Sequence, residues 1–378
     1  MNKNQCILRS GPVVTCVGTD YIICVPVTKD VLMKINVDDE EFFFHCNGVR
    51  ISSTRLQRFI VPCEKLNKAR SYTVSYKEIT ERKPYSCSFG EEKSHTYNFR
   101  PLEKNEGVNI YCISDAHGKD APAVGAAGYF GDNLDLLILN GDISSSSETE
   151  DDVLLQYDIA YRITKGEIPC IIVRGNHDLR GKFAEKLGEY LPTQSGRTYY
   201  SVTLGSFWFL VLDCGEDKDD SHREYSSTVC CHRFRKEETE YIRFIAANKK
   251  KEFLKEGVKH RIIISHVPFE YNNMSVCKLE KPFNIEQEIY DEWCRLIRDE
   301  IKAEFMLCGH IHTSEIWRNG KNDDKGIRIP VVVGGDPGKK YNKDDNYCGT
   351  ALTVYSDRAE IVFNDGKLNC SLKEKIEF

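Results

Sequence analysis

The sequence lacks any pair of cysteines separated by two residues, although it contains 16 cysteines among its 378 residues. This absence excludes zinc ribbons and thioredoxin-type redox motifs, which need that spacing. Several cysteines, such as Cys24, Cys112, Cys170 and Cys308, stand inside apolar runs, where a free thiol packs as a small hydrophobic group. A disulfide scaffold would instead require a small exported chain. We therefore expect reduced thiols and a cytoplasmic protein.

Long apolar runs and an excess of positive charge are also missing. Apolar stretches such as YIICVPV are too short to span a bilayer, and the first residues lack the pattern of a secretory leader. The 58 acidic and 52 basic residues give a net charge of -6, so nothing draws the whole chain toward nucleic acid or acidic membranes. We expect neither a membrane nor a nucleic acid as a partner, and the sequence points to no protein partner.

The sequence pattern changes near residue 105. Before that point, short β-branched or aromatic runs alternate with turns, which is typical of a sandwich of about seven strands. After Pro101, apolar strands alternate with amphipathic helical segments, which indicates a layered α/β arrangement. We therefore predict an all-β domain over residues 1–105 and an α/β (α+β layered) domain over residues 106–378.

Local patterns predict further elements of the second domain. Thr149 and Asp152 resemble a capping box ahead of an apolar helical face, and residues 286–303 have helical spacing of apolar side chains. The segment 213–235 is rich in Asp, Ser and Arg without a period, so we expect a long loop there. The runs TALTVYS and AEIVF near the end read as paired strands.

Five apolar runs of the second domain end directly in a polar cluster. In chain order, VNIYCIS precedes DAH, LLILN precedes GD, CIIV precedes GNHD after one arginine, RIIIS precedes His266, and FMLC precedes GHIH. The carboxyl ends of strands in layered α/β proteins converge on one crevice, where ligands bind. We therefore expect the five clusters to meet in one site.

These clusters offer oxygen and imidazole donors without thiolate, a set that suits Mn, Fe or Zn ions. Eight such groups would serve two divalent, or mixed divalent and trivalent, metal ions with one carboxylate bridging. The glycines before three of them permit close backbone approaches that a side chain would hinder. The eight residues are Asp115, His117, Asp142, Asn176, His177, His266, His310 and His312.

The ordered series DxH, GD, GNHD, a lone His after a strand, and GHxH resembles the calcineurin-like metallophosphoesterase superfamily over about residues 106–378. The resemblance implies a β-sandwich flanked by helices. It also implies hydrolysis of phosphoric esters by a hydroxide that two metal ions activate.

The resemblance implies a role for each residue of the series. One ion would be bound by a carboxylate and two imidazoles, namely Asp115, His117 and His312. The other would be bound by an amide and two imidazoles, namely Asn176, His266 and His310. Asp142 would bridge the two ions, and His177 would protonate the leaving group or stabilise the transition state.

The all-β region ahead of the catalytic unit resembles the fibronectin-like domain that precedes the catalytic domain in purple acid phosphatases. Two positions depart from that subgroup. It has DxG where this chain has His117 in third place, and GDxxY where this chain has Ser145 in place of the metal-bound tyrosine. Without that tyrosinate we expect neither the purple colour nor a stabilised ferric ion.

Several motifs allow a second interpretation. Taken singly, each polar cluster is also typical of a turn or a helix cap, so the prediction depends on their joint order. Arg174 and Arg180 flank the GNHD cluster and could grip a phosphate in bidentate fashion, or form surface salt bridges. We assign Arg180, together with Asn176, to substrate binding. A set of four residues in the loop could hold a third ion or be an accidental cluster, namely His222, Cys230, Cys231 and His232.

The leading prediction is a phosphomonoesterase or phosphodiesterase that acts on a small or nucleotide-like phosphate ester. A nuclease is one alternative, although it would need a basic, aromatic-lined track. A catalytically silent phosphoesterase fold that serves as an interaction scaffold is another, although it would be expected to have lost ligands. The FFFH segment of the all-β region could form a separate binding patch or pack into the core.

Overall fold

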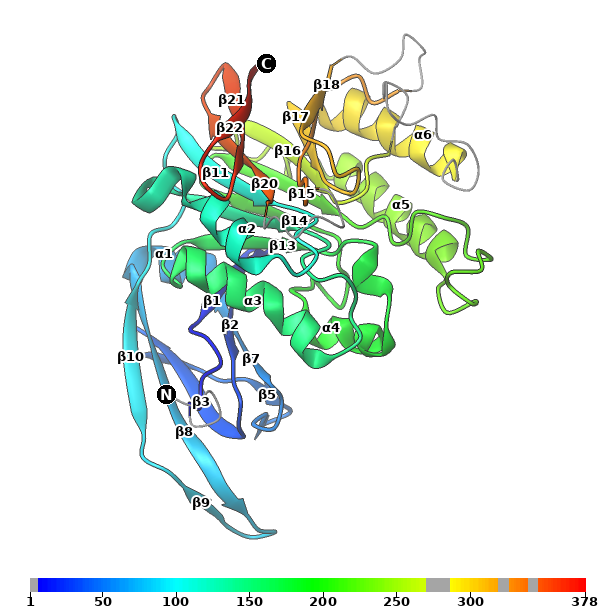
Figure 1. Ribbon diagram of the computed structural model, residues 1–378. Coiled ribbons are helices and arrows are strands. Elements are labelled where there is room, and N and C mark those ends of the chain that lie inside the picture. The colour runs from blue at the N-terminus through cyan, green and yellow to red at the C-terminus, as the bar shows by residue number, and fades with distance from the viewer. Residues whose placement is uncertain (1–5, 270–285, 319–325, 339–345) are drawn as a thin grey trace.

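The computed structural model describes residues 6–269, 286–318, 326–338 and 346–378. Figure 1 shows the two large sheets of the catalytic unit with helices on their outer sides, and a further sheet near the N-terminus that ends in a long hairpin. The sheets and helices together position the polar clusters predicted from the sequence.

The larger sheet has nine strands in the order β22-β21-β20-β11-β12-β13-β1-β2-β7. Its centre is parallel, because β11 pairs with β12, β12 with β13, and β13 with β1 in that sense. The central strands are almost entirely buried and apolar, as expected for parallel strands covered on both faces. The strands span Val13–Val17 (β1), Asp20–Pro26 (β2), Leu56–Pro62 (β7), Val108–Ile113 (β11), Leu136–Asn140 (β12), Pro169–Val173 (β13), Cys348–Val354 (β20), Arg358–Asp365 (β21) and Cys370–Glu377 (β22).

A second sheet has six strands in the order β14-β15-β16-β17-β19-β18. Strands β15, β16, β17 and β19 run parallel to one another, so their carboxyl ends lie at one edge. The strands span Tyr200–Leu204 (β14), Phe207–Leu212 (β15), His260–Ser265 (β16), Phe305–Cys308 (β17), Glu315–Trp317 (β18) and Val331–Val333 (β19).

Alternate side chains of β15 belong to two different cores, which shows how the layers pack. One set joins the core shared with the nine-stranded sheet, namely Phe207, Phe209 and Val211. The other set packs with helices α5 (Cys231–Ala247) and α6 (Gln287–Arg295), namely Trp208, Leu210 and Leu212. Helices α2 (Asp120–Ala127) and α3 (Glu150–Thr164) contact the nine-stranded sheet. Two sheets between helical layers confirm the predicted α/β architecture.

The predicted helices and terminal strands are present. Helix α3 begins after a capping box formed by Thr149 and Asp152. The predicted helix over residues 286–303 consists of α6 followed by a π-helical turn, Leu296–Ile301. Strands β20 and β21 pair antiparallel. The predicted loop over residues 213–235 ends earlier, because α5 begins at Cys231. The remaining helical segments are α1 (Cys63–Ala69), α4 (Leu187–Tyr190) and the 3-10 turns Gly128–Asn133, His177–Leu179 and Lys182–Lys186.

The N-terminal region is all-β apart from α1, as predicted, but its strands do not form a sandwich separate from the catalytic unit. Strands β1, β2 and β7 belong to the nine-stranded sheet, where Val14 of β1 lies opposite Pro169 of β13. The hydrogen-bonded sheet therefore crosses the boundary predicted near residue 105, and the division at that residue stays a prediction. The other sheet holds β3 (Val31–Val37), β4 (Glu40–Phe42), β8 (Ser71–Arg82) and β10 (Lys93–Asn98), with β9 (Cys87–Phe89) on β8, and β5 (His45–Cys46) pairs with β6 (Val49–Arg50).

Three further expectations concern the FFFH segment, the cysteines and membrane-spanning helices. Phe42 and Phe44 pack against the core while Phe43 is exposed, so alternate residues of the FFFH segment serve packing. The fifteen cysteines that the structure describes are all free. Within the described residues, no helix combines the length and the apolar character needed to cross a membrane.

Glu238 of α5 is a buried carboxyl group that makes the stability of the fold depend on pH. It accepts a hydrogen bond from the backbone N–H of Asp213 at 2.8 Å, and burial raises its pKa well above the usual value. Because the native pKa exceeds the unfolded one, the protonated form is favoured in the native state. Its contribution to stability is complete below the unfolded pKa, near 4.5, and is lost as pH rises toward the native pKa.

We predict that Glu238→Gln flattens the alkaline side of the stability profile. In the wild type, this group lowers the free energy of unfolding by at most about 1.4 kcal/mol per pH unit above its unfolded pKa. Urea unfolding at pH 5.5 and pH 8 measures the difference. The exposed neighbour change Glu237→Gln serves as a control. Equal pH dependence in the wild type and Glu238→Gln would contradict a neutral buried carboxyl.

Candidate metal centre

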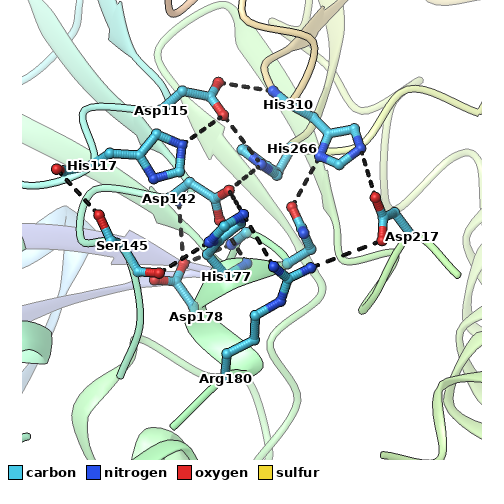
Figure 2. Close-up of polar contacts among 12 residues, drawn as sticks. Asp115, His117, Asp142, Ser145, His177, Asp178, Arg180, Asp217, His266 and His310 are labelled. Atoms are coloured by element: carbon cyan, nitrogen blue, oxygen red, sulfur yellow. Dashed lines mark hydrogen bonds and ion pairs between the residues drawn. The ribbon is translucent and has the colours of Figure 1, made fainter. Parts of the chain in front are cut away.

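The five predicted polar clusters meet at one edge of the two sheets, at the carboxyl ends of β11, β12, β13, β16 and β17. Figure 2 shows their side chains pointing toward one another. Backbone hydrogen bonds tie the loops together: the N–H of Asp115 donates to the carbonyl of Gly141 at 3.1 Å, and that of His117 to the carbonyl of Asp142 at 3.0 Å. The clusters therefore converge because the strands that carry them are neighbours in two packed sheets.

Asp115 lies fully buried at the centre of a ring of imidazoles. Its Oδ1 atom is 3.3 Å from Nε2 of His312, 3.7 Å from Nε2 of His266 and 3.8 Å from Nε2 of His117. Its Oδ2 atom accepts a hydrogen bond from the backbone N–H of His310 at 2.8 Å. Three overlapping groups of three residues have all their ligand atoms within 4.8 Å of one another: Asp115, His117 and His312; His117, Asp142 and His177; Asp115, Asp142 and His266.

Asp142 is the second buried carboxylate. Its Oδ1 atom accepts a hydrogen bond from the backbone N–H of His177 at 2.9 Å, and its Oδ2 atom lies 3.2 Å from Nε2 of His266. Burial alone would raise its pKa, but the adjacent His266 holds the pKa of Asp142 well below the usual range. Asp142 therefore stays ionised. The neighbouring Asp178, also buried, has its pKa raised by burial and by the charge of Asp142.

His266 has a fixed orientation between the two carboxylates. Its Nδ1 atom lies 2.7 Å from the carbonyl oxygen of Asn140, which can only accept, so this nitrogen carries a proton. In the neutral ring, Nε2 then presents a lone pair to Asp115 and Asp142. This arrangement is repulsive unless a cation lies between them. Burial disfavours a charged ring, but in the metal-free protein the two carboxylates raise the pKa of His266.

His117 and His312 complete the side of the site around Asp115. Their Nε2 atoms lie 3.1 Å apart. Burial lowers the pKa of His117 to about 4, so its ring is neutral at pH 7 and offers a lone pair. Burial also opposes charge on His312, but the adjacent carboxylate of Asp115 raises its pKa.

His177 and Arg180 lie beside Asp142. Nδ1 of His177 is 2.9 Å from the carbonyl oxygen of Ser145, so it donates, and Nε2 faces Nη1 of Arg180 at 3.3 Å. Burial lowers the pKa of His177, and the charge of Arg180 also lowers it although Asp142 acts in the opposite direction. The ring is thus held in one tautomer with Nε2 directed into the site.

Asn176 and His310 form the side opposite His117. The side-chain amide of Asn176 is buried and lies 2.9 Å from Nδ1 of His310. The structure thus brings together every residue that the sequence analysis assigned to the site.

Arg180 is not a free phosphate-binding group. Its Nε and Nη2 atoms donate to the carboxylate of Glu216 at 2.7 and 2.9 Å, which leaves Nη1 facing the site. Arg174 points elsewhere and pairs with the buried carboxylate of Asp213 at 2.7 Å. The bidentate geometry predicted for a phosphate is therefore used by a carboxylate of the chain itself.

Glu216 and the adjacent Asp217 are site residues that the sequence analysis missed. Both are buried, and Oδ2 of Asp217 lies 3.4 Å from Nε2 of His310. The sequence pattern that identified the five predicted clusters is also present here, because the apolar run FWFLVL of β15 ends in the polar sequence DCGED. Strand β15 is parallel to β16, so its carboxyl end lies at the edge that carries the site.

The proposed third-metal cluster of the loop is not assembled. Cys231 is buried and accepts a hydrogen bond from the N–H of Glu216, whereas His232 pairs with the carboxylate of Glu286. His222 lies in a turn that ends at Tyr225. Among the residues that the structure describes, no group with metal-ligand spacing contains these side chains.

The backbone of the site adopts an unusual conformation. Five of its non-glycine residues have φ between 46° and 70°, a left-handed region that costs on the order of 1–3 kcal/mol per residue, namely Asp115, His117, Asp142, His310 and His312. Such strain persists where the surrounding structure determines it, and it clusters at functional sites.

The family scan agrees with this geometry. The calcineurin-like phosphoesterase family matches residues 108–314, which include β11, β17 and the loops that carry the site. The chain belongs to the calcineurin-like phosphoesterase family. Membership supports metal-dependent hydrolysis of a phosphoester. A search of curated protein sequences gives no significant match.

Solved structures support the fold of this phosphoesterase over almost its whole length. A purple acid phosphatase from yellow lupin (Lupinus luteus) seeds is similar with a TM-score of 0.58 and 12% identity, over 98% of this chain and 75% of that chain. PhoD is similar with a TM-score of 0.53 and 12% identity, over 96% of this chain and 88% of that chain. Both likenesses extend through the N-terminal all-β region, in agreement with its predicted resemblance to a fibronectin-like domain.

The site of this phosphoesterase fits the metal ions that its family implies. Oδ1 of Asp115 is buried and accepts no hydrogen bond from the described residues, although three imidazole nitrogens surround it. The neutral ring of His117 and the ionised carboxylate of Asp142 add further electron-pair donors to the site. Oxygen and imidazole donors in this number suit divalent transition ions.

We predict that Gly175→Ala disrupts the centre by displacing Asp142. A Cβ atom at residue 175 would collide with Oδ1 of Asp142 and lie 2.6 Å from its backbone nitrogen. We expect a large loss of bound metal, measured by elemental analysis of the purified protein. Gly188→Ala is the matched control, because a Cβ there meets nothing within 4 Å. Normal metal content in Gly175→Ala would contradict the close approach.

Proposed function

We propose that this phosphoesterase is a binuclear enzyme that hydrolyses a phosphoric monoester or diester of a small or nucleotide-like compound. The observation that carries the proposal is the buried, unpaired oxygen of Asp115, surrounded by three imidazole nitrogens at 3.3 to 3.8 Å. A second cation fits near Asp142, because Nε2 of His266 faces both carboxylates.

The proposed ligand sets follow the resemblance and the geometry. One ion would be held by Asp115, His117 and His312. The other would be held by Asn176, His266 and His310. Asp142 would serve both ions, since it lies between the two sets. When bound, two such ions would neutralise phosphoryl oxygens and lower the pKa of a water nucleophile.

His177 is proposed to assist the departing oxygen. Its Nδ1 proton is committed to the carbonyl oxygen of Ser145, so Nε2, which faces Nη1 of Arg180, is the ring nitrogen left to act on the substrate. To donate from Nε2 the ring must be positively charged, because a neutral ring carries only one proton. Burial lowers the pKa of His177, so the charged form is favoured at acidic pH.

Arg180 is proposed to contact the substrate through Nη1. Glu216 fixes the guanidinium plane through two hydrogen bonds and leaves this nitrogen beside His177. A guanidinium in that position would meet a phosphoryl oxygen and stabilise its charge.

We predict metal-dependent turnover of p-nitrophenyl phosphate or bis(p-nitrophenyl) phosphate after reconstitution with Mn²⁺. The ratio of kcat/KM for the two compounds separates a monoesterase from a diesterase. EDTA-treated protein is the control. Absence of turnover with both compounds, in protein that binds metal, would contradict general phosphoesterase activity and favour an interaction scaffold. Preferential cleavage of oligonucleotides would favour the nuclease alternative.

We predict that His177→Asn keeps its metal and loses turnover of an alkyl phosphate ester by about 10²- to 10⁴-fold, the usual contribution of a general acid. In the wild-type protein, kcat for that ester should fall as pH rises, because the fraction of His177 that is positively charged decreases above its lowered pKa. Esters of p-nitrophenol, a good leaving group, should be less affected. Unchanged kcat on the alkyl ester would exclude the role, and loss of metal would make His177 a ligand.

A further inference from the structure

Asp217 lies beside the proposed metal centre, and its side chain is buried and held by neighbouring polar groups. Its side chain is 7% exposed, and its Oδ2 atom lies 3.4 Å from Nε2 of His310 (Figure 2). Its Oδ1 atom accepts hydrogen bonds from the hydroxyl of Tyr225 at 2.9 Å and from Nζ of Lys218 at 3.0 Å. One carboxylate oxygen is thus anchored within the loop, and the other is directed at a single ring nitrogen of the site.

Hydrogen bonds to helix α5 fix the loop that carries Asp217. Arg235 is fully buried, and its Nε atom donates to the carbonyl oxygen of Cys214 at 2.9 Å. Its Nη2 atom donates to the carbonyl oxygen of Glu216. Asp220 accepts hydrogen bonds from the first backbone N–H groups of α5. The backbone before Asp217 and the side chain of Asp220 after it are therefore held to one helix.

The ring of His310 faces different partners through its two nitrogens. Nδ1 lies 2.9 Å from the side-chain amide of Asn176, a proposed ligand, whose NH₂ group donates to it in the amide orientation that satisfies both side chains, whereas Nε2 faces Asp217. A neutral imidazole has one donor and one acceptor nitrogen, and a carboxylate can only accept. Asp217 therefore selects the tautomer with the proton on Nε2, which leaves the lone pair of Nδ1 directed toward Asn176.

We propose that Asp217 is a positioning residue that holds His310 with Nδ1 presented to a metal ion. This role rests on the proposed function, because it requires a metal centre at Asn176, His266 and His310. Carboxylates that accept the second N–H of a ligating histidine fix the ring and make it a better ligand, and their loss typically weakens metal binding by about 10- to 100-fold.

Burial of Asp217 and its partners agrees with this role. Because Lys218 and Tyr225 occupy the other oxygen, Oδ2 remains directed at His310.

The test compares the apoprotein of the wild type with Asp217→Asn and Asp217→Ala. Mn²⁺ titration by calorimetry should show that Asp217→Ala binds one of two equivalents about 10- to 100-fold more weakly and the other normally. Asp217→Asn should be affected less, because its amide oxygen can still accept the Nε2 proton. The exposed neighbour change Asp219→Asn is the control and should leave both affinities unchanged.

A second measurement does not depend on any substitution of Asp217. Long-range proton–nitrogen correlation spectra of the ¹⁵N-labelled metal-free wild type report the tautomer of each histidine. The His310 signals are assigned by comparison with His310→Gln. The proposal predicts a proton on Nε2 of His310, and a proton on Nδ1 would overturn it even if the Asp217 variants fail to fold.

The calorimetric outcomes separate this role from the function on which it rests. A wild type that binds no Mn²⁺ or Zn²⁺ overturns the metal centre and the role together. A wild type that binds metal, with unchanged affinities in Asp217→Ala, overturns the role of Asp217 alone. Complete loss of one equivalent at saturating metal would make Asp217 a direct ligand and would also overturn the positioning role.

Discussion

The arrangement of the site depends on two carboxyl groups that are almost completely removed from water. Asp115 is 0% and Asp142 is 1% exposed, and an isolated charge in such surroundings carries a large desolvation cost. Backbone N–H groups of His310 and His177 satisfy one oxygen of each carboxylate. The other two oxygens face imidazole nitrogens, which balance their charge only when they carry protons or share a metal ion. Positive charge at this position is therefore a requirement of the fold as well as of the chemistry.

The two packed sheets supply the rigidity that this charge cluster requires. Left-handed backbone at five site residues and the close approach of Gly141 to Gly175 are tolerated because a buried parallel strand fixes the start of each loop. Gly309 illustrates the constraint, since a Cβ there would lie 2.6 Å from Oδ2 of Asp115. The glycines that precede site residues therefore serve sterically, by letting neighbouring loops approach to hydrogen-bonding distance.

The sequence predicted the parts of the site that follow from local pattern. A buried strand ending in a polar cluster needs only neighbouring residues to be recognised, so β11, β12, β13, β16 and β17 and their eight polar residues were all identified. The equivalent signal after β15 was missed because DCGED opens a long polar segment and was interpreted as part of a loop. The pairing of β1 with β13 was also missed, because alternation of apolar residues predicts a strand but does not specify a partner some 150 residues away.

The loop after β15 connects two groups of the site that the sequence analysis treated separately. Glu216 orients Arg180, the proposed substrate contact, and the next residue, Asp217, faces His310, a proposed metal ligand. The two residues are adjacent in the loop after β15, so one short stretch of backbone reaches both groups. Arg235 holds that stretch through two carbonyl groups, and its own charge is buried in α5. Displacement of this loop would therefore disturb the guanidinium and the imidazole together, which couples the geometry of the proposed phosphate contact to that of the proposed metal centre.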